Sequence, residues 1–284
     1  MNIAIVTDST AAPTKEQQEK YQFEIVPVNV RFEGKIFKEF VDLTAAQAYQ
    51  FLDKNPEEFA TSAPSPGDFL SVYKKAAEKG AKEILCLTIS PKISATLNSA
   101  RMAKELAKTE LPDIRIEIID TQAIASPETL LCLAAAKERE KGKTLDEIVQ
   151  SIEDLKKKVK VFVVLETIRY VYRSGRIPEV ASKIGAILPL KPILTISDGS
   201  LRLFGATISK QKSIEKVLKI MKGGWNENLP EIGIMHADCL PEAEELKKKV
   251  NQLFPSSQVF ISECSPIIGY ATGRDSLLIA YFAK

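Results

Sequence analysis

The sequence predicts an α/β protein of two domains, namely a parallel-sheet, three-layer α/β/α N-terminal domain and a mixed-sheet, two-layer α/β C-terminal domain. In the first half, short apolar runs alternate with amphipathic segments, which is typical of βαβ units and a parallel sheet. In the second half, the turn sequence Ser197-Asp198-Gly199-Ser200 separates two strand-like segments and indicates a hairpin, which favours a mixed sheet. A chain of 284 residues is long enough for two ordinary domains.

The elements of the first half follow from these patterns. We expect strands at Ile3–Thr7, Glu24–Phe32, Glu83–Thr88 and Arg115–Ile119. We expect helices at Lys15–Tyr21, Thr44–Asn55, Pro66–Lys79, Ile93–Lys108 and Pro127–Lys141. A lysine-rich amphipathic helix at Thr144–Val159 then links the two domains, so we expect the N-terminal domain to span residues 1–158 and the C-terminal domain residues 159–284.

The second half mixes a hairpin with helices. The apolar stretch Ile184–Ile196 and the segment Leu201–Ile208 flank the predicted turn. Further strands are expected at Lys160–Leu165, Glu231–His236, Gln258–Glu263 and Ser276–Phe282. Helices are expected at Lys210–Lys222 and Glu242–Phe254.

Composition and charge exclude several classes of function. The net charge of +2, from 39 basic and 37 acidic residues, argues against nucleic acid as a partner. No apolar run is long enough for a membrane span, so we expect at most transient membrane contact. Met1 leads into a short strand rather than a signal peptide, and the four cysteines are widely spaced, which predicts free buried thiols in the cytoplasm. The only histidine, His236, excludes a histidine-rich metal site.

Two clusters of hydroxyl side chains precede predicted helices. The first is Thr61-Ser62-Ala63-Pro64-Ser65-Pro66, and the second is Ile89-Ser90-Pro91-Lys92-Ile93-Ser94-Ala95-Thr96. We interpret Ser65 and Ser90 as helix caps, with Pro66 and Pro91 at the first helical positions. The remaining hydroxyls, on Thr61, Ser62, Ser94 and Thr96, exceed what capping needs. Because a helix start presents unpaired N–H groups, we predict a binding site for a carboxylate or phosphate there.

Ionisable residues offer a competing interpretation. Asp8 and Asp120 follow predicted strands, and His236-Ala237-Asp238 stands at the end of another. These residues are candidates for a metal- or acid/base-dependent hydrolase or phosphotransferase, although such aspartates more often cap turns or helices and such a His–Asp pair is more often structural. Arg176 is a candidate for binding an anion, because a guanidinium group suits carboxylates.

These motifs resemble the DegV family of fatty-acid-binding proteins, which includes the FakB subunits of bacterial fatty acid kinase. The resemblance runs nearly end to end. It rests on Thr7-Asp8-Ser9-Thr10, on the two hydroxyl clusters, on Ile119-Asp120-Thr121, on Ser174-Gly175-Arg176-Ile177 and on Ile267-Ile268-Gly269.

The resemblance implies a fatty acid in the cleft between two α/β domains. It also implies that Thr61, Ser94 and the main-chain N–H of Ala95 bind the carboxylate, and we add Ser62, Thr96 and Arg176 as candidates. The ligand is then a long-chain fatty acid, with no cofactor, no metal and no catalytic residue, and a fatty acid kinase subunit is the implied partner. Candidate residues for the apolar tunnel are Ile177, Ile184, Ile187, Leu188, Ile193, Leu194, Ile267 and Ile268.

The sequence departs from the family pattern in several places. Two departures lie earlier in the chain than the others, where Ser94-Ala95-Thr96 stands for the usual Ser-Gly-Thr and Ser174-Gly175-Arg176 for the frequent Gly-Gly-Arg. Near the C-terminus, Ala271 replaces a typical His, and Arg274-Asp275 replaces Pro-Gly. Ile208 stands where an Arg is common after the hairpin, with Lys210 and Lys212 nearby. In kinase-coupled members these His and Arg positions are associated with head-group binding and with the kinase, so their loss puts acyl-phosphate production in question. Arg274 is a candidate for a replacement charge. We therefore expect a lipid-binding carrier rather than an enzyme, with a lipid-sensing regulatory module as a further alternative.

Overall fold

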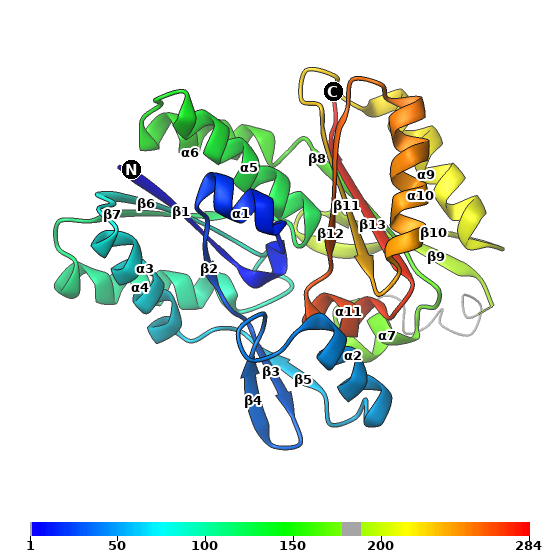
Figure 1. Cartoon of the computed structure of the whole chain (residues 1–284), viewed down its shortest axis with the longest axis horizontal. Coiled ribbons are helices and arrows are strands. Elements are labelled where there is room, and N and C mark those ends of the chain that lie inside the picture. The colour runs from blue at the N-terminus through cyan, green and yellow to red at the C-terminus, as the bar shows by residue number, and fades with distance from the viewer. Residues whose placement is uncertain (1, 178–188) are drawn as a thin grey trace.

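Three sheets form the framework of the protein. The computed structural model describes residues 2–177 and 189–284. A parallel sheet has the strand order β2-β1-β6-β7, a mixed sheet has the order β10-β9-β8-β13-β11-β12, and a small antiparallel sheet has the order β4-β3-β5. The first two sheets form two lobes, and the small sheet lies below them (Figure 1). The predicted fold class is confirmed, whereas the sequence patterns do not predict the third sheet. The domain boundary at residue 158 stays a prediction.

Helices cover both faces of the parallel sheet. Its strands are β1 (Ile3–Asp8), β2 (Glu24–Val26), β6 (Glu83–Thr88) and β7 (Arg115–Asp120). The helices of this lobe are η1 (Ser9–Ala11), α1 (Lys15–Tyr21), α3 (Pro66–Glu78), α4 (Thr96–Glu110), α5 (Ser126–Glu140) and α6 (Leu145–Leu155). Helices α3 and α4 cover one face, and α5 and α6 cover the other (Figure 1). The predicted helices therefore fall where the βαβ pattern requires them.

Helix α5 joins the two lobes. It contacts β1 and β6 of the parallel sheet and also β8, β11 and β13 of the mixed sheet. Its residues from Ser126 to Leu133 are all buried, which fits a helix that is apolar on nearly all sides and packs between two layers. The two lobes consequently share a continuous hydrophobic core.

The mixed sheet is covered by helices on its outer face. Its strands are β8 (Val159–Val164), β9 (Lys191–Ser197), β10 (Ser200–Thr207), β11 (Glu231–Ala237), β12 (Gln258–Glu263) and β13 (Ser276–Phe282). The covering helices are α9 (Lys210–Gly224) and α10 (Leu240–Leu253). The predicted hairpin is present between β9 and β10, and Asp198 and Gly199 at its tip have φ values of 50° and 75°. Two positive φ values in a two-residue turn match the twist of the flanking strands.

The small sheet corrects one predicted strand. Glu24–Phe32 is divided into β2 in the parallel sheet and β3 (Asn29–Phe32) in the small sheet, with Pro27 between them. Proline lacks the N–H that a continuing ladder would need, so it marks this change of sheet. The remaining elements of this region are β4 (Lys35–Lys38), α2 (Ala45–Lys54), β5 (Ala60–Ser62), α7 (Arg169–Ser174) and α11 (Pro266–Thr272).

The start of α4 corrects a second prediction. Residues 91–93 form a turn in which the N–H groups of Ile93 and Ser94 donate to Ser90 O, at 3.0 and 3.1 Å. The helix begins only at Thr96, so Ser90 is not its cap and Pro91 is not its first residue. Ser65, in contrast, caps α3 as predicted, in a reciprocal arrangement with Asp68.

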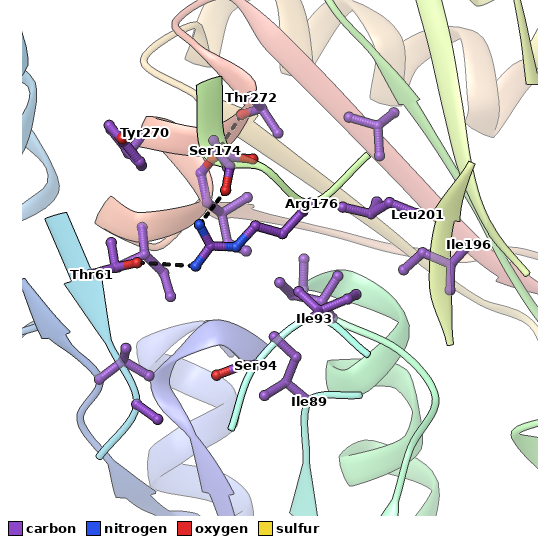
Figure 2. A pocket seen from close by; sticks show the side chains of 18 of the residues that line it. Thr61, Ile89, Ile93, Ser94, Ser174, Arg176, Ile196, Leu201, Tyr270 and Thr272 are labelled. Carbon is purple, nitrogen blue, oxygen red and sulfur yellow. Dashed lines mark hydrogen bonds between the residues drawn. The ribbon is translucent and has the colours of Figure 1, made fainter. Parts of the chain in front are cut away.

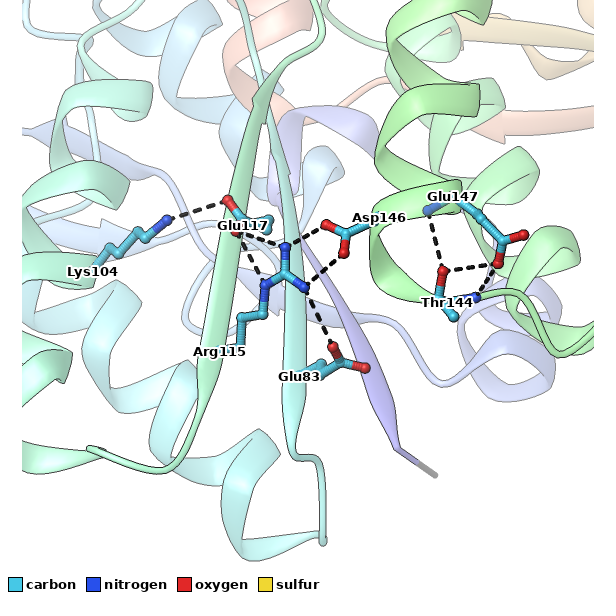
Figure 3. A network of polar contacts seen from close by, with 7 residues as sticks. All are labelled: Glu83, Lys104, Arg115, Glu117, Thr144, Asp146 and Glu147. Atoms are coloured by element: carbon cyan, nitrogen blue, oxygen red, sulfur yellow. Dashed lines mark hydrogen bonds and ion pairs between the residues drawn. The ribbon is translucent and has the colours of Figure 1, made fainter.

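A surface network ties α6 to the parallel sheet. Arg115 on β7 bonds Asp146 in the first turn of α6 and lies 3.3 Å from Glu117 and 4.0 Å from Glu83 (Figure 3). These side chains surround the amino ends of β6 and β7, the edge of the sheet away from the polar strand ends. Within the described residues, no helix is long and apolar enough to cross a membrane.

Candidate functional site

A cavity of about 240 Å³ lies where the three sheets meet. The parallel-sheet lobe contributes the loops after β6 and β7, the small sheet contributes β5, and the mixed sheet contributes β8, β9, β10 and β13. Helix α11 and the segment after α7 complete the wall. Most of the lining is apolar, and the polar side chains belong mainly to Thr61, Ser62, Ser94, Ser174, Arg176 and Thr272.

The polar groups gather at one side of this cavity. In Figure 2, Arg176 extends from the segment after α7 toward Thr61, and Ser94 lies below it, whereas Ile196 and Leu201 lie on the opposite side of the view. Arg176 Nη2 is 3.5 Å from Thr61 Oγ1 and donates to it. Its Nη1 donates to the carbonyl oxygen of Ser174, which fixes the direction of the guanidinium.

Backbone structure explains why these side chains meet. Thr61 lies on β5, opposite Val30 of β3, so the small sheet fixes its position. Ser94 ends the turn that follows β6, and its Oγ lies 2.8 Å from the Oγ1 of Thr96 and also accepts from the Thr96 N–H at 3.4 Å. The loops after parallel strands are the usual position for ligand sites in open α/β sheets.

The start of α4 adds a positive potential to the same place. Ala95 is the N-cap residue and offers no side-chain cap. Within the described ranges, its own N–H has no hydrogen-bond partner. The partial positive charge of a helix N-terminus thus remains available at the cavity, next to a guanidinium that no carboxylate of the described residues pairs with. This combination can bind the carboxylate of a ligand.

The structure brings together most of the predicted head-group residues. Thr61, Ser62, Ser94, Ala95 and Arg176 all line the cavity. Thr96 does not line it, because its fully buried hydroxyl faces Ser94, so it acts on the cavity only through that residue. Its predicted role as a direct contact therefore becomes one of orienting Ser94.

The predicted tunnel residues divide into three groups. Ile267 and Ile268 line the cavity. Ile177, Ile193 and Leu194 do not line it and instead pack in the hydrophobic cores. Ile184, Ile187 and Leu188 lie outside the described residues. Sequence reasoning missed Ile89, Ile124, Val161, Val163, Ile196, Leu201 and Leu278, which line the apolar part.

The residues that depart from the family pattern lie in different surroundings. Ala271 is part of the cavity wall, so the typical His would reach the site from this position. Arg274 does not line the cavity and pairs with Asp53 at 2.7 Å and Asp238 at 3.3 Å, which corrects its candidacy as a replacement charge. Ile208 is exposed. Lys210 pairs with Glu242 of α10.

The competing catalytic residues lie away from the cavity. Asp8, Asp120 and His236 do not line it. Asp8 is buried and accepts the N–H groups of Thr10 and Ile89, each at 3.0 Å, whereas Asp120 accepts the N–H of Gln122 at 2.8 Å. His236 Nδ1 accepts the N–H of Cys239 at 3.4 Å. Among residues 2–177 and 189–284, no group of three or more His, Cys, Asp or Glu side chains is placed to hold a metal ion.

A buried acidic cluster holds the backbone of two cavity-lining residues, Ile89 and Ile267. It comprises Asp8, Glu128 and Glu39 with the hydroxyls of Thr7, Ser9 and Thr10. Desolvation raises the pKa of Asp8, and it raises the pKa of Glu128 well above its usual value, with the charge of Asp8 adding to the effect. Thr10 has one hydroxyl proton but faces Asp8 Oδ1 at 2.5 Å and Glu128 Oε2 at 3.1 Å, so a protonated Glu128 suits this geometry.

Glu39 connects this cluster to α11. Its Oε1 accepts the N–H of Ile267 at 2.7 Å, and its Oε2 accepts the hydroxyl proton of Ser9 at 2.5 Å. Helix α11 carries Ile267, Ile268, Tyr270 and Ala271 into the cavity wall. Glu39, in the segment between β4 and α2, therefore helps to position that wall. Sequence reasoning missed this role, because Glu39 directly follows Lys38 and such neighbouring charges are typical of an exposed segment.

The comparisons with known proteins agree with this architecture. The sequence matches the family described as "Uncharacterised protein, DegV family" over residues 2–284. A DegV domain-containing protein of Clostridium acetobutylicum is 28% identical, over 99% of this chain and 99% of its own length.

Two solved structures extend the comparison to three dimensions. A DegV family protein of Thermus thermophilus, described by its fatty acid binding, has a TM-score of 0.86 at 27% identity and covers 99% of this chain and 100% of its own. DegV of Bacillus subtilis, described as a fatty acid binding protein, has a TM-score of 0.87 at 25% identity, with 100% of both chains covered. Because the family match spans nearly the whole sequence and the fold agrees with it, this protein belongs to the DegV family.

Proposed function

We propose that this protein is a carrier that holds a long-chain fatty acid in the cavity between its two lobes and catalyses no reaction. The observation that carries the proposal is the division of one cavity into a small polar end with unused hydrogen-bond donors and a larger apolar remainder. Relatives from Thermus thermophilus and Bacillus subtilis that share the fold are described as binding fatty acids.

The carboxylate is held at the polar end. The donors that line this end are the hydroxyls of Thr61 and Ser94, the N–H of Ala95 and the guanidinium of Arg176. In Figure 2, Thr61, Ser94 and Arg176 approach it from different directions. Each hydrogen bond to a charged acceptor contributes roughly 1.5–3 kcal/mol. Donors on several sides fix the direction of the carboxylate, so they orient the ligand as well as bind it.

The acyl chain supplies most of the affinity. Burying a methylene group is worth roughly 0.8 kcal/mol, so a tail of about sixteen carbons contributes on the order of 10 kcal/mol before the entropy losses of association. The side chains that would contact the tail include Ile89, Ile93, Ile196, Leu201 and Leu278. The described lining of the whole cavity contains hydroxyls and one guanidinium but no His, Cys, Asp, Glu or Lys that could activate a hydroxyl as a nucleophile, which supports a carrier rather than an enzyme.

The fate of the bound acid depends on a partner. A fatty acid kinase subunit is the partner that the family resemblance implies, and the carrier would present the carboxylate to it. Ala271 lines the cavity where kinase-coupled members carry His, and this observation favours a second candidate, a lipid-sensing regulatory module. Pull-down experiments with and without fatty acid, using a fatty acid kinase subunit as bait, separate the two, because the carrier binds the kinase and the regulator does not.

Lipid extraction and native mass spectrometry of the purified protein test the proposal directly. We expect one fatty acid per chain, and the double variant Thr61→Ala/Ser94→Ala to retain it about tenfold less well or worse. The matched control Ser71→Ala/Thr109→Ala removes exposed hydroxyls of α3 and α4 that do not line the cavity, and it should retain the ligand. A delipidated protein that binds no labelled fatty acid would refute the proposal.

A further inference from the structure

A second cavity adjoins the far end of the first. It has a volume of about 200 Å³ and shares two lining residues with the first cavity, Val161 of β8 and Ile196 of β9. The rest of its lining is mostly polar and consists of Gln122, Ala123, Pro127, Lys156, Lys157, Val159, Lys160, Ser197, Asp198 and Gly199. Two apolar side chains thus separate an apolar compartment from a compartment with three lysines.

The strand pairing holds this partition in place. Ile196 lies opposite Leu201 across the β9–β10 hairpin, and Leu201 also lines the first cavity. The hydroxyl of Thr195 donates to the carbonyl oxygen of Val161 at 2.8 Å, which joins β9 to β8 directly beside the partition. Both side chains therefore rest on paired strands rather than on a loop.

The tip of the hairpin is docked against the other lobe. Gly199 has a φ of 75°, and a Cβ atom placed on it would lie 2.5 Å from Ser90 Oγ and 3.6 Å from Gln122 Cα. Ser90 follows β6 and Gln122 follows β7, so the tip rests on the strand-end loops of the parallel sheet. Only glycine permits this contact, because it has a positive φ and lacks a side chain. Ile196 and Leu201 of this hairpin line the first cavity on the side away from Thr61 (Figure 2).

The second cavity is a poor environment for a hydrocarbon chain. The side chain of Lys156 is only 10% exposed, and its Nζ donates to the carbonyl oxygen of Asp120 at 3.1 Å and pairs with Glu153 at 2.7 Å. An acyl chain that entered would remove water from these groups without replacing their hydrogen bonds, which is unfavourable. Lysines would instead favour a carboxylate there.

These observations limit both the length of the acyl chain and the chemistry of its far end. Building on the proposed function, we propose that Ile196 and Val161, held by the docked β9–β10 hairpin, set the maximum acyl length and restrict the ligand to monocarboxylic acids with an apolar terminus. The methyl end of the ligand stops against these two side chains. A chain with a second carboxylate would place a charge against an apolar wall and bind weakly.

Binding of a graded series of straight-chain acids to the delipidated protein tests this inference. In the wild type, affinity should rise with each methylene until the chain meets the wall, and then fall. Ile196→Ala removes three carbons from the wall, so the optimum should move to chains about two to four carbons longer, with the first longer acid bound about tenfold more tightly than by the wild type. Val161→Ala should shift the optimum in the same direction and serves if Ile196→Ala does not fold.

A matched control removes the same atoms from the same strand. Ile193 on β9 is buried in the core on the other face of the sheet and does not line the cavity. Ile193→Ala should lower stability and leave the preferred length unchanged. A second readout uses an acid with a carboxylate at each end, which the wild type should bind weakly and Ile196→Ala should bind better, because the opened wall gives access to Lys156 and Lys160.

The outcomes separate this inference from the proposed function. An unchanged optimum in folded Ile196→Ala and Val161→Ala that still bind fatty acids would overturn the length-limiting role alone. A shift of the same size in Ile193→Ala would also overturn it, because the effect would then come from loosening the sheet. A wild type that binds none of the acids would instead refute the proposed function.

Discussion

Two polar clusters lie near the carboxyl ends of the parallel strands, and they differ in how many of their donors and acceptors have hydrogen-bond partners. In the buried acidic cluster, Asp8 accepts from two backbone N–H groups and one hydroxyl, and Glu39 accepts from one of each. In the cavity, Ala95 and Arg176 belong to the lining, and within the described residues the Ala95 N–H has no hydrogen-bond partner and the Arg176 guanidinium has no carboxylate partner. A satisfied cluster stabilises the fold, whereas an unsatisfied one at a cavity is available for binding.

This difference also explains why the charged residues that suggest catalysis are structural. Asp8 is fully buried, does not reach the cavity and holds the turn that leads to Ile89. The residues that line the cavity carry fewer charges and more hydroxyls. Four substitutions test the comparison, from the largest expected effect to the smallest.

Asp8→Ala should cost about 2–4 kcal/mol of unfolding free energy, because it orphans two buried N–H groups, leaves the Thr10 hydroxyl only its longer contact with Glu128, and creates a small void. Asp120→Ala is the matched control, since that carboxylate ends a strand of the same sheet and accepts only the N–H of Gln122. Urea denaturation measures both. Equal losses of unfolding free energy in the two variants would contradict the structural role assigned to the acidic cluster.

Glu39→Gln tests the link between the acidic cluster and α11 through its pH dependence. Burial raises the pKa of Glu39 to about 7 from an ordinary value of 4.5, despite the hydrogen bonds from Ser9 and Ile267. Between these values the folded protein holds a proton that the unfolded chain has lost. The Glu39 contribution to stability is therefore complete below pH 4.5 and is lost as the pH rises through about 7.

The glutamine variant cannot titrate, so its stability relative to the wild type should improve between pH 5 and pH 8 by up to about 3 kcal/mol. Denaturation at a series of pH values measures this difference. Glu263→Gln is a suitable control, because Glu263 is an exposed carboxylate outside the cluster. A difference between wild type and Glu39→Gln that does not change with pH would show that Glu39 does not titrate in this range.

Arg176→Ala should weaken fatty acid binding about tenfold to a hundredfold, because it removes a charged donor that no carboxylate of the described residues occupies. Displacement of a fluorescent fatty acid measures the change. A fatty alcohol of equal length provides the contrast, since its head group is uncharged and its affinity should change much less. Equal losses for acid and alcohol would assign Arg176 to shaping the cavity instead.

Arg115→Ala should have the smallest effect of the four. Arg115 joins a network of carboxylates on the surface, where water and salt screen the charges (Figure 3). We expect a small fall in the melting temperature that disappears in concentrated salt, and no change in ligand binding. A large fall in the melting temperature that does not depend on salt would show that exposed and buried networks contribute equally to stability.

Much of the local structure could be predicted because its causes are local. Ser65, Pro66 and Asp68 define the start of α3, and the structure confirms that start. The pair Asp198–Gly199 defines the hairpin tip, since both residues adopt positive φ readily. The prediction at Ser90-Pro91 was wrong because the same residue types also form a turn, and the turn satisfies the N–H groups of Ile93 and Ser94.

The elements that sequence patterns did not predict depend on partners that are distant along the chain. Helix α11 is only seven residues long, and its first turn is held by Glu39, which lies 228 residues away from Ile267 along the chain. It packs against α2 through Gly269, where Tyr49 leaves no room for a side chain. Strand β5 has three residues and exists as a strand because β3 pairs with it. Segments this short carry too little pattern to be recognised alone.

The sequence by itself determined the fold class, most helices and strands, and the hydroxyl-rich turns from which the head-group site is predicted, because helix caps, turn residues and apolar periodicity act over a few neighbouring residues. Only the tertiary structure decided that Arg176 meets Thr61, that Asp8 and Glu128 are buried away from the cavity, and that Ile196 and Val161 line both cavities. These relations join residues from different sheets, and packing between the lobes, rather than any local preference, brings them into contact.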